Sequence, residues 1–599
     1  MNRKNKSRRG RRSANVRRSR RLVLVWMGVL LAGVVGCAAW VGIRMFLSYT
    51  ELSQAQTEAS AVVAAVSADP AQAAEYESAR LDALAARLDS ASALTATRSG
   101  GSRRPSRSRA TTCAPTGSQS TASPPRSVTV CAPLVPAFAR MGAAISLTDG
   151  RVDLAQVAES AQELGRASSV LEESRKTLAG ADGGAVVTPL ADGVRKAGSM
   201  VDDLSHTVSA LSTAAKVIPA ALGADGEKRY GLLMNNNAEL RTTGGIAGAI
   251  SPVTATDGAI ALGDQLVPDD LNPATAAAPA VTREEATLFG PTLSSYIQNV
   301  NATPDFSRTA AFASELWADA RGEKLDGVVS VDTVTLSRLL AVTGPVTAEG
   351  RELTSENATK VLLNDIYLQV TDRAEHDRFF GAVTRAVFDK LLHGGASALG
   401  MAKALDAAAE EGRISIWFAD PALQSAIAGT NLAGPTARLS DDGAPVGVFL
   451  IDGTAGKMDY YLDGSLAASC TNGGKSGVSV TTTLRSTAPA EIANAPWYVT
   501  GAGQSTTSVG SIRTMLQFAS TDSLRPERVT VDGKPVTLKW ATIDGRNVAV
   551  AVVDLAPGAT ATVGADFALL PAKSVTLDRI VGTPTATAFA TKVDAGRCG

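Results

Sequence analysis

The eleven residues from 235 to 245 contain the combination of side chains best suited to hold an anion. They read Asn-Asn-Asn-Ala-Glu-Leu-Arg-Thr-Thr-Gly-Gly, and the candidate ligand-binding residues among them are Asn235, Asn236, Glu239, Arg241, Gly244 and Gly245. Consecutive glycines let backbone N–H groups approach an anion, and a guanidinium group can hold a phosphate through two hydrogen bonds. Glu239 could act as a general base, or it could pair with Arg241. The alternative is a tight turn in which Asn and Gly supply positive φ and the charges form a structural pair.

A second group of charged residues, Asp-Arg-Ala-Glu-His-Asp-Arg, covers 372–378. Arg378 and Arg385 are two helical turns apart, so a helix places them on one face, and Asp377 directly precedes the first of them. Two arginines on one face could hold a diphosphate. Because Asp389 lies four residues after Arg385, we favour a solvated face of salt bridges instead.

Motifs of well-known catalytic and metal sites are missing from the sequence. The three histidines, at 206, 376 and 393, belong to no HExxH pattern, and no Ser/His/Asp hydrolase arrangement is visible. The segment 473–476, Gly-Gly-Lys-Ser, resembles part of a P-loop, but position 469 is Ser where that motif requires Gly, and we interpret the segment as a turn. The cysteines show neither CxxC nor Cys/His zinc spacing. We therefore expect no metal site and no cofactor.

Short apolar strands alternate with helices around these charged segments. Strands are predicted over 230–234, 246–255, 259–262 and 327–331, and helices over 283–300, 306–321, 333–342, 354–368 and 377–392. Such interleaving predicts a layered α/β domain over 225–425. The segment 235–245 then follows the end of a strand, where ligands commonly bind in α/β sheets.

After residue 440 the helical pattern ends. Alternating or β-branched runs predict strands over 446–451, 458–462, 478–484, 512–518, 529–531, 536–540 and 548–553, with Asp-Gly turns between some of them. At least seven short strands at such intervals predict a C-terminal β-sandwich over 440–599.

An uncharged run of 22 residues, 22–43, is long enough to cross a membrane as a helix. Residues 36–39 loosely resemble a cleavage site, but a cleavable signal peptide would have a shorter apolar region, so we favour a retained anchor. The basic residues of 1–21 predict a cytoplasmic tail and place residues 45–599 outside the cell membrane. The lipid bilayer is therefore the first expected partner.

Residues 44–220 are mostly Ala-rich and helical in pattern, which is typical of a stalk. Within them, 98–133 changes to Ser, Gly, Thr, Pro and Arg, which predicts a disordered loop rather than a basic patch for an anionic polymer. Four cysteines lie outside the predicted span. Cys113 and Cys131 bracket this loop and are expected to pair with each other, which leaves Cys470 to pair with Cys598. An oxidising compartment makes both bridges reasonable.

The formal net charge of zero hides an asymmetry. Residues 1–21 carry eleven Lys and Arg and no acid, so the remaining 578 residues carry 47 basic against 58 acidic groups. An acidic body argues against nucleic acid as a partner. The sequence thus predicts a multi-domain α+β protein with one transmembrane helix, a helical stalk, a layered α/β domain and a C-terminal β-sandwich.

Three stretches together resemble a bacterial envelope family, the domain of unknown function 4012. They are Asn235–Gly245, Asp326–Asp332 with Leu339–Val346, and Val448–Leu462. The resemblance covers about residues 225–465. It implies a single-pass membrane protein of an actinobacterial cell envelope, in a family some of whose members are encoded near polysaccharide genes.

A weaker likeness is to the LytR–CpsA–Psr phosphotransferases, which move glycans from polyprenyl pyrophosphate onto the cell wall. By the order of parts, Arg241 matches their first pyrophosphate-binding Arg. The residues near their later Asp/Arg cluster are Asp377, Arg378 and Arg385. Thr243 stands where those enzymes carry a metal-binding Asp, and their Ser-Ile-Pro-Arg-Asp has no counterpart, because Val267–Asp270 lacks the Arg. Neutralising a pyrophosphate leaving group is therefore hard to explain.

Two functions follow as expectations. The sequence slightly favours a non-catalytic protein of the cell envelope that binds or organises envelope polysaccharide or its polyprenyl-phosphate-linked precursor. The alternative is a phosphotransferase-like enzyme that attaches glycan from polyprenyl pyrophosphate to the cell wall, and only this alternative requires a divalent metal.

Overall fold

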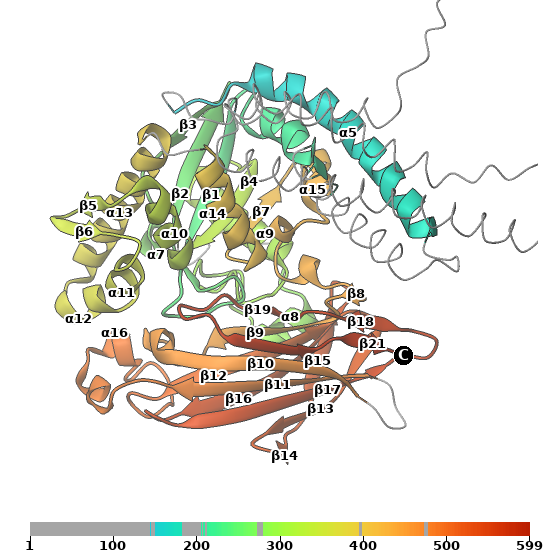
Figure 1. Cartoon of the computed structure of the whole chain (residues 1–599). Coiled ribbons are helices and arrows are strands. Elements are labelled where there is room, and N and C mark those ends of the chain that lie inside the picture. The colour runs from blue at the N-terminus through green and yellow to red at the C-terminus, as the bar shows by residue number, and fades with distance from the viewer. Residues whose placement is uncertain are drawn as a thin grey trace, which may run out of the picture. The chain divides into compact units, whose positions relative to one another are not determined.

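Figure 1 shows the computed structural model of the chain, which describes residues 150–181, 212–271, 280–394, 398–471 and 477–599, together with positions 144, 205, 208 and 209. Within these residues, no helix is both long and apolar enough to cross a membrane. The predicted span 22–43 lies outside them, as do the loop 98–133, most of the predicted stalk, and the cysteines at 113 and 131. These parts stay predictions.

The chain forms two compact units. One comprises residues 1–141 and 159–212, and its described part is mainly residues 159–181 of helix α5 (Leu154–Ala181). The other comprises residues 142–158 and 213–599 and holds every sheet described below. It combines helices with several sheets, so the predicted mixed α+β class is confirmed.

A five-stranded sheet forms the centre of the α/β part, in the order β3-β2-β1-β4-β7. Its strands are β1 (Lys228–Asn236), β2 (Ile246–Thr256), β3 (Ala259–Leu262), β4 (Gly327–Asp332) and β7 (Ile414–Phe418). Only the β1–β4 pair is parallel, and the other neighbours are antiparallel. The turn between β2 and β3 has positive φ at both Asp257 (49°) and Gly258 (79°), the geometry that Asp-Gly favours in a tight hairpin.

Helices lie between and after these strands in the chain, and polar side chains cap the start of several of them. They are α7 (Pro268–Leu271), α8 (Arg283–Phe289), α9 (Phe306–Arg321), α10 (Thr333–Thr343), α13 (Arg373–His393), α14 (Ala398–Glu410) and α15 (Pro421–Ile427). The Asp305 carboxylate accepts from the Ser307 N–H at the start of α9, and Asp332 caps α10 in the same way. On α9, Phe312 and Leu316 belong to one apolar cluster with strand residues Leu233 and Val328.

Two predicted helices are wrong in extent. The helix predicted over 283–300 ends at Phe289, because Gly290 and Pro291 follow, and residues 291–300 form turns. The helix predicted over 354–368 is broken into α11 (Ala358–Lys360), one π-helical turn (Val361–Asp365) and α12 (Ile366–Gln369). A short hairpin, β5 (Val346–Ala348) and β6 (Arg351–Leu353), precedes it.

The C-terminal part contains a six-stranded and a five-stranded sheet, ordered β14-β13-β17-β11-β10-β20 and β15-β16-β12-β9-β19 (Figure 1). The strands of the first are β10 (Leu462–Thr471), β11 (Gly477–Ser486), β13 (Leu524–Val531), β14 (Lys534–Pro535), β17 (Thr560–Leu569) and β20 (Ala590–Asp594). The strands of the second are β9 (Val446–Asp452), β12 (Ile512–Ser520), β15 (Lys539–Ile543), β16 (Arg546–Leu555) and β19 (Val581–Gly582). A small third sheet holds β8 (Asp442–Gly443), β18 (Val575–Leu577) and β21 (Gly596–Cys598).

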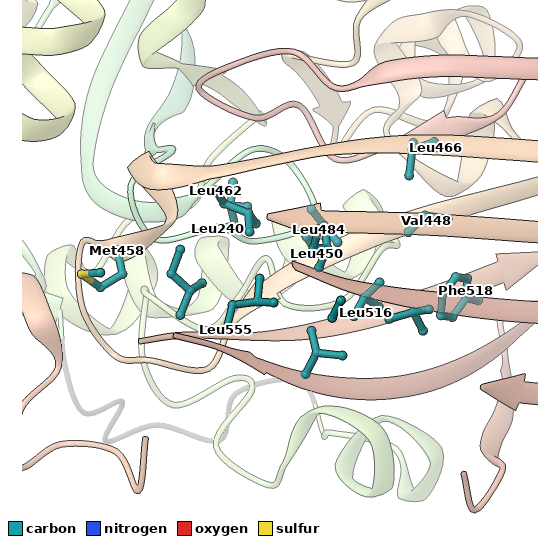
Figure 2. Packing of buried hydrophobic residues seen from close by; sticks show 14 of the residues in the cluster. Leu240, Val448, Leu450, Met458, Leu462, Leu466, Leu484, Leu516, Phe518 and Leu555 are labelled. Carbon is teal, nitrogen blue, oxygen red and sulfur yellow. The ribbon is translucent and has the colours of Figure 1, made fainter. Parts of the chain in front are cut away.

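The core of this part lies between the two large sheets. Alternate residues of β11 are buried. Leu484 of β11 joins Leu516 and Phe518 of β12 in one apolar cluster (Figure 2). The same cluster contains Val563 and Phe567 of β17. Each large side chain buried here contributes about 2 kcal/mol by removing apolar surface from water. The pattern that predicted strands along this segment thus comes from one-sided burial.

Two predicted strands are wrong. Residues 458–461 form a 3-10 helix, because the Asp459 N–H donates to the Ala238 carbonyl and Met458 is buried in the core instead of alternating along a sheet. In the predicted strand 536–540 only Lys539 and Trp540 are extended in a sheet, at the start of β15.

A disulfide joins Cys470 of β10 to Cys598 of β21, with the Cα atoms 5.4 Å apart. This is the pairing predicted for the last domain. It closes a loop across 128 residues. In the chain-entropy view such a loop stabilises the folded state by about 5 kcal/mol.

Candidate functional site

The loop 237–245 leaves the carboxyl end of β1, beside the end of the parallel strand β4. Asn235, at the end of β1, is buried, and its amide donates to the Thr243 carbonyl (3.0 Å), to Thr243 Oγ1 (3.1 Å) and to Ser330 Oγ (2.7 Å). Asn301 donates to Thr243 Oγ1 (3.0 Å) and to the Gly245 carbonyl (2.6 Å). These bonds fix the base of the loop from inside the protein.

Gly244 and Gly245 allow the loop to approach itself closely. Gly244 has φ of 112°, and its N–H donates to the Arg241 carbonyl (2.9 Å). A Cβ at Gly245 would lie 2.0 Å from the Asn236 carbonyl oxygen. The glycines are therefore required by the path of the backbone. The N–H of Gly244 donates to a carbonyl of the same loop.

Asn236 connects the loop to helices α12 and α13. Its amide donates to the Tyr367 hydroxyl, and the Tyr367 ring meets the His376 ring edge-on, with centroids 5.1 Å apart. His376 Nε2 is 2.9 Å from the Val370 carbonyl. Burial raises the pKa of Tyr367, so its hydroxyl stays protonated.

Glu239 forms an ion pair with Lys457, and these side chains are only 14% and 16% exposed. The Lys457 ammonium also lies 5.0 Å from the centre of the Tyr367 ring. Burial lowers the pKa of Lys457 to about 8. An ion pair with Arg241 was one of the two roles that the sequence left open for Glu239. The structure gives it a lysine 218 residues away instead.

Arg241 lies near two buried carboxylates, Asp452 and Asp459, which favour its charged form against the effect of burial, and burial lowers its pKa. Its Nη1 donates to the Leu240 carbonyl (2.8 Å). Its Nε is shut off from solvent and has no hydrogen-bond partner among the described residues. Burial raises the pKa of both aspartates.

The same aspartates hold the loop in place. Asp459 Oδ2 accepts from the Leu240 N–H (2.8 Å), and the Asp452 N–H donates to the Leu240 carbonyl (2.8 Å). Leu240 is fully buried and lies with Met458, Leu462 and Leu555 at the end of the sandwich core (Figure 2). The tip of the loop thus inserts Leu240 into the core of the C-terminal part.

A second buried ion pair beside the loop was not predicted. Asp332 Oδ2 accepts from Arg413 Nη1 (2.6 Å) and from Asn237 Nδ2 (2.9 Å), and both charged side chains are almost fully buried. Arg413 Nη2 also donates to the Thr585 carbonyl (3.1 Å). The position of Asp332 between a strand and a helix indicates its role as a helix cap. Nothing in the sequence around Arg413 indicates its role in the ion pair.

Helix α13 presents the other predicted residues at its surface. Arg378 pairs with Glu375 (3.6 Å) and Arg385 is exposed. The expected pair of Arg385 with Asp389 does not occur among the described residues, and Asp389 bonds to His393 instead (3.0 Å). Burial raises the pKa of Asp377, and Asp269 and Asp270 act in the same direction.

The structure therefore brings part of the predicted set together and leaves part of it apart. Asn235, Asn236, Glu239, Arg241 and the two glycines share one loop, and Asp377 lies near Tyr367. Among the described residues no contact joins Arg378 or Arg385 to Arg241. No cluster of three metal-ligating side chains occurs in the described part of the chain. Assignment of these residues to an anion site stays a prediction.

Comparison with known proteins finds a match for one segment of the chain. No curated protein matches the sequence. One similar solved structure is a candidate nutrient-binding protein from Legionella pneumophila subsp. pneumophila str. Philadelphia 1, with 12% identity and a TM-score of 0.15 over 23% of this chain and 49% of the other. This chain thus spans about half the length of that protein.

Residues 225–367 match the family described as "Protein of unknown function (DUF4012)". The match includes the loop 237–245 and the strand–helix segment around Asp332. It confirms the predicted resemblance over a shorter range than 225–465. Residues 225–367 are thus similar to the DUF4012 family.

Proposed function

We propose that this protein is a single-pass, membrane-anchored extracytoplasmic protein of the bacterial cell envelope, in an actinobacterium, that binds or organises envelope polysaccharide or its polyprenyl-linked precursor without catalysis. The observation that carries the non-catalytic part is the loop 237–245. Its acid, Glu239, is neutralised by Lys457, and its arginine lies beside Asp452 and Asp459. The charges that a transferase would use are thereby engaged within the fold.

The position of Thr243 supports the same proposal. It stands where the phosphotransferases carry a metal-binding Asp, and here its hydroxyl accepts from Asn235 and Asn301 while the side chain is 1% exposed. A buried hydroxyl with two donors holds the loop together and supplies no negative charge to a cation. The transfer reaction would have to neutralise its leaving group by other means.

The extracytoplasmic location rests on two features. The apolar run 22–43 follows a basic tail, which by the positive-inside rule leaves the remainder outside. The Cys470–Cys598 disulfide favours an oxidising compartment, where such bonds form and persist.

The test is purification of the full chain from its own membranes, followed by analysis of co-purified polysaccharide and by lipid extraction and mass spectrometry. We expect envelope polysaccharide or polyprenyl phosphate to co-purify with the parent. Arg241→Gln is expected to retain it, since the neighbouring carboxylates already balance the Arg241 charge. Glycan transfer from polyprenyl pyrophosphate by the purified parent with Mg²⁺, abolished in Arg241→Gln, would overturn the proposal in favour of the enzyme.

A further inference from the structure

Two hollows adjoin on the surface of the C-terminal part and share Arg525 and Glu527. The first, of about 550 Å³, is lined by Arg525, Pro526, Glu527, Arg528, Trp540 and Asp566. The second, of about 600 Å³, continues past Arg525 and Glu527 to residues 568–573 and Gly599. We call the two together the edge groove, since β15, which carries Trp540, is the outermost strand of its sheet.

Trp540 supplies a large apolar surface to the edge groove. It is 40% exposed, although an indole is among the most favourable side chains to bury. By contrast, Trp317 of α9 is almost fully buried. An exposed indole beside polar groups in a hollow is typical of a binding surface.

A β-bulge in β13 arranges the charged side of the edge groove. Pro526 pairs with Phe567 and Arg528 pairs with Asp566, so the strand register shifts at Glu527. The bulge leaves two successive charged residues, Glu527 and Arg528, on the exposed side of the strand.

The charged groups of the groove differ in how firmly they are held. Arg528 donates twice to Asp566 (2.8 and 2.6 Å), and Asp566 also accepts from Ser479 Oγ (2.8 Å). The side chain of Arg525 has no hydrogen bond or ion pair within the described part of the chain, nor does the ammonium of Lys573. Three cationic and two carboxylate side chains thus line the groove, and within the described residues two of the cations have no partner.

We propose that the edge groove binds a polysaccharide chain that carries acidic groups. The indole face would pack against the C–H face of a sugar ring, Arg525 and Lys573 would pair with sugar carboxylates, and the fixed Arg528–Asp566 pair would hydrogen-bond hydroxyl groups. The two adjoining hollows suit an extended chain. This inference rests on the proposed function and names the site at which polysaccharide is bound.

The test measures binding of the full chain in detergent by biolayer interferometry. The probes are polygalacturonate, dextran as a neutral glycan, poly-L-glutamate as an acidic peptide, and polysaccharide extracted from the host envelope. The variants are Trp540→Ala, Trp540→Phe and Arg525→Gln. Trp497→Ala is the matched control, because Trp497 is 48% exposed and does not line the groove. Thermal unfolding verifies that each variant is folded.

The parent is expected to bind polygalacturonate more tightly than dextran. Trp540→Ala should weaken that binding about tenfold or more, Arg525→Gln about threefold, and Trp540→Phe should retain most of it, with Trp497→Ala like the parent. Binding of poly-L-glutamate as tight as that of polygalacturonate would overturn the inference, as would parent-like binding by Trp540→Ala and Arg525→Gln. If the parent still binds host polysaccharide in that case, the proposed function stands. If the parent binds none of the four probes, the inference falls, and so does the polysaccharide-binding part of the proposed function.

Discussion

The loop 237–245 and the edge groove both gather arginine and carboxylate side chains, but they differ in what surrounds those charges. In the loop, Glu239 meets Lys457 and the leucine between the two charged residues is buried in the sandwich core. In the groove, Arg525 and Trp540 face solvent. A conspicuous charged motif can therefore be engaged in joining two parts of a fold, while an inconspicuous strand edge remains free for a partner.

Of the substitutions that test this comparison, Arg413→Met is expected to lower the free energy of unfolding most. The substitution leaves the carboxylate of Asp332 buried without its cation, although Asn237 still donates to it. Loss of one member of a buried pair costs about 4 kcal/mol. Urea unfolding of the full chain measures it, and a loss below about 1 kcal/mol would mean that the region around the loop is less rigid than described. The exposed Arg378→Met is the control.

Leu240→Ala tests how much the burial of this loop residue stabilises the protein. Truncation of a fully buried leucine costs about 3 kcal/mol, because the cavity fills only in part. The same unfolding measurement applies. Leu368→Ala, at a 41% exposed leucine, is the control and should change stability by less than about 0.5 kcal/mol. Equal effects of the two would refute the role of Leu240.

Asp459→Asn tests the surroundings of the Asp459 carboxyl group through the pH dependence of stability. Burial and Asp452 raise the pKa of Asp459, so the folded state binds a proton more readily than the unfolded state. The free energy of unfolding of the parent should therefore rise as the pH falls from 7 toward the ordinary pKa of an aspartate. The expected rise relative to Asp459→Asn is on the order of 1 kcal/mol.

Unfolding at a series of pH values in both proteins measures that difference. Asn keeps an acceptor oxygen for the Leu240 N–H, so the substitution removes the titration with little change of shape. Parallel pH profiles for the two proteins would contradict the assignment.

The smallest effect is expected from the double substitution Arg378→Ala and Arg385→Ala. Both arginines are exposed on α13, and the one ion pair of Arg378 is on the surface. Stability should change by less than about 0.5 kcal/mol, and retention of host polysaccharide should not change. A clear loss of bound polyprenyl phosphate in this variant would instead bring the arginines back as an anion site.

Local patterns predicted the elements that depend on local chemistry. The helix 306–321 is predicted to the residue, since Asp305 caps its start and Gly322 ends it with φ of 69°. The strand 446–451 and the Asp257-Gly258 turn follow from burial and turn geometry in the same way. These features need only neighbours in sequence.

Features that depend on distant partners could not be predicted. Nothing near Glu239 indicates Lys457, and nothing near Arg413 indicates Asp332. Residues 458–461 alternate as a strand would, yet their contacts with the loop turn them into a 3-10 helix. The edge groove combines residues of β13, β15 and β17, whose proximity follows from the pairing of whole sheets.

The Cys470–Cys598 bond makes the chain from residue 470 to residue 598 a covalent ring. A protease that cuts one peptide bond inside this ring opens it without releasing a fragment, so both pieces stay attached to the rest of the protein. Every residue that lines the edge groove lies within the ring or directly beyond Cys598. A single cleavage within the ring would therefore leave this surface tethered to the chain.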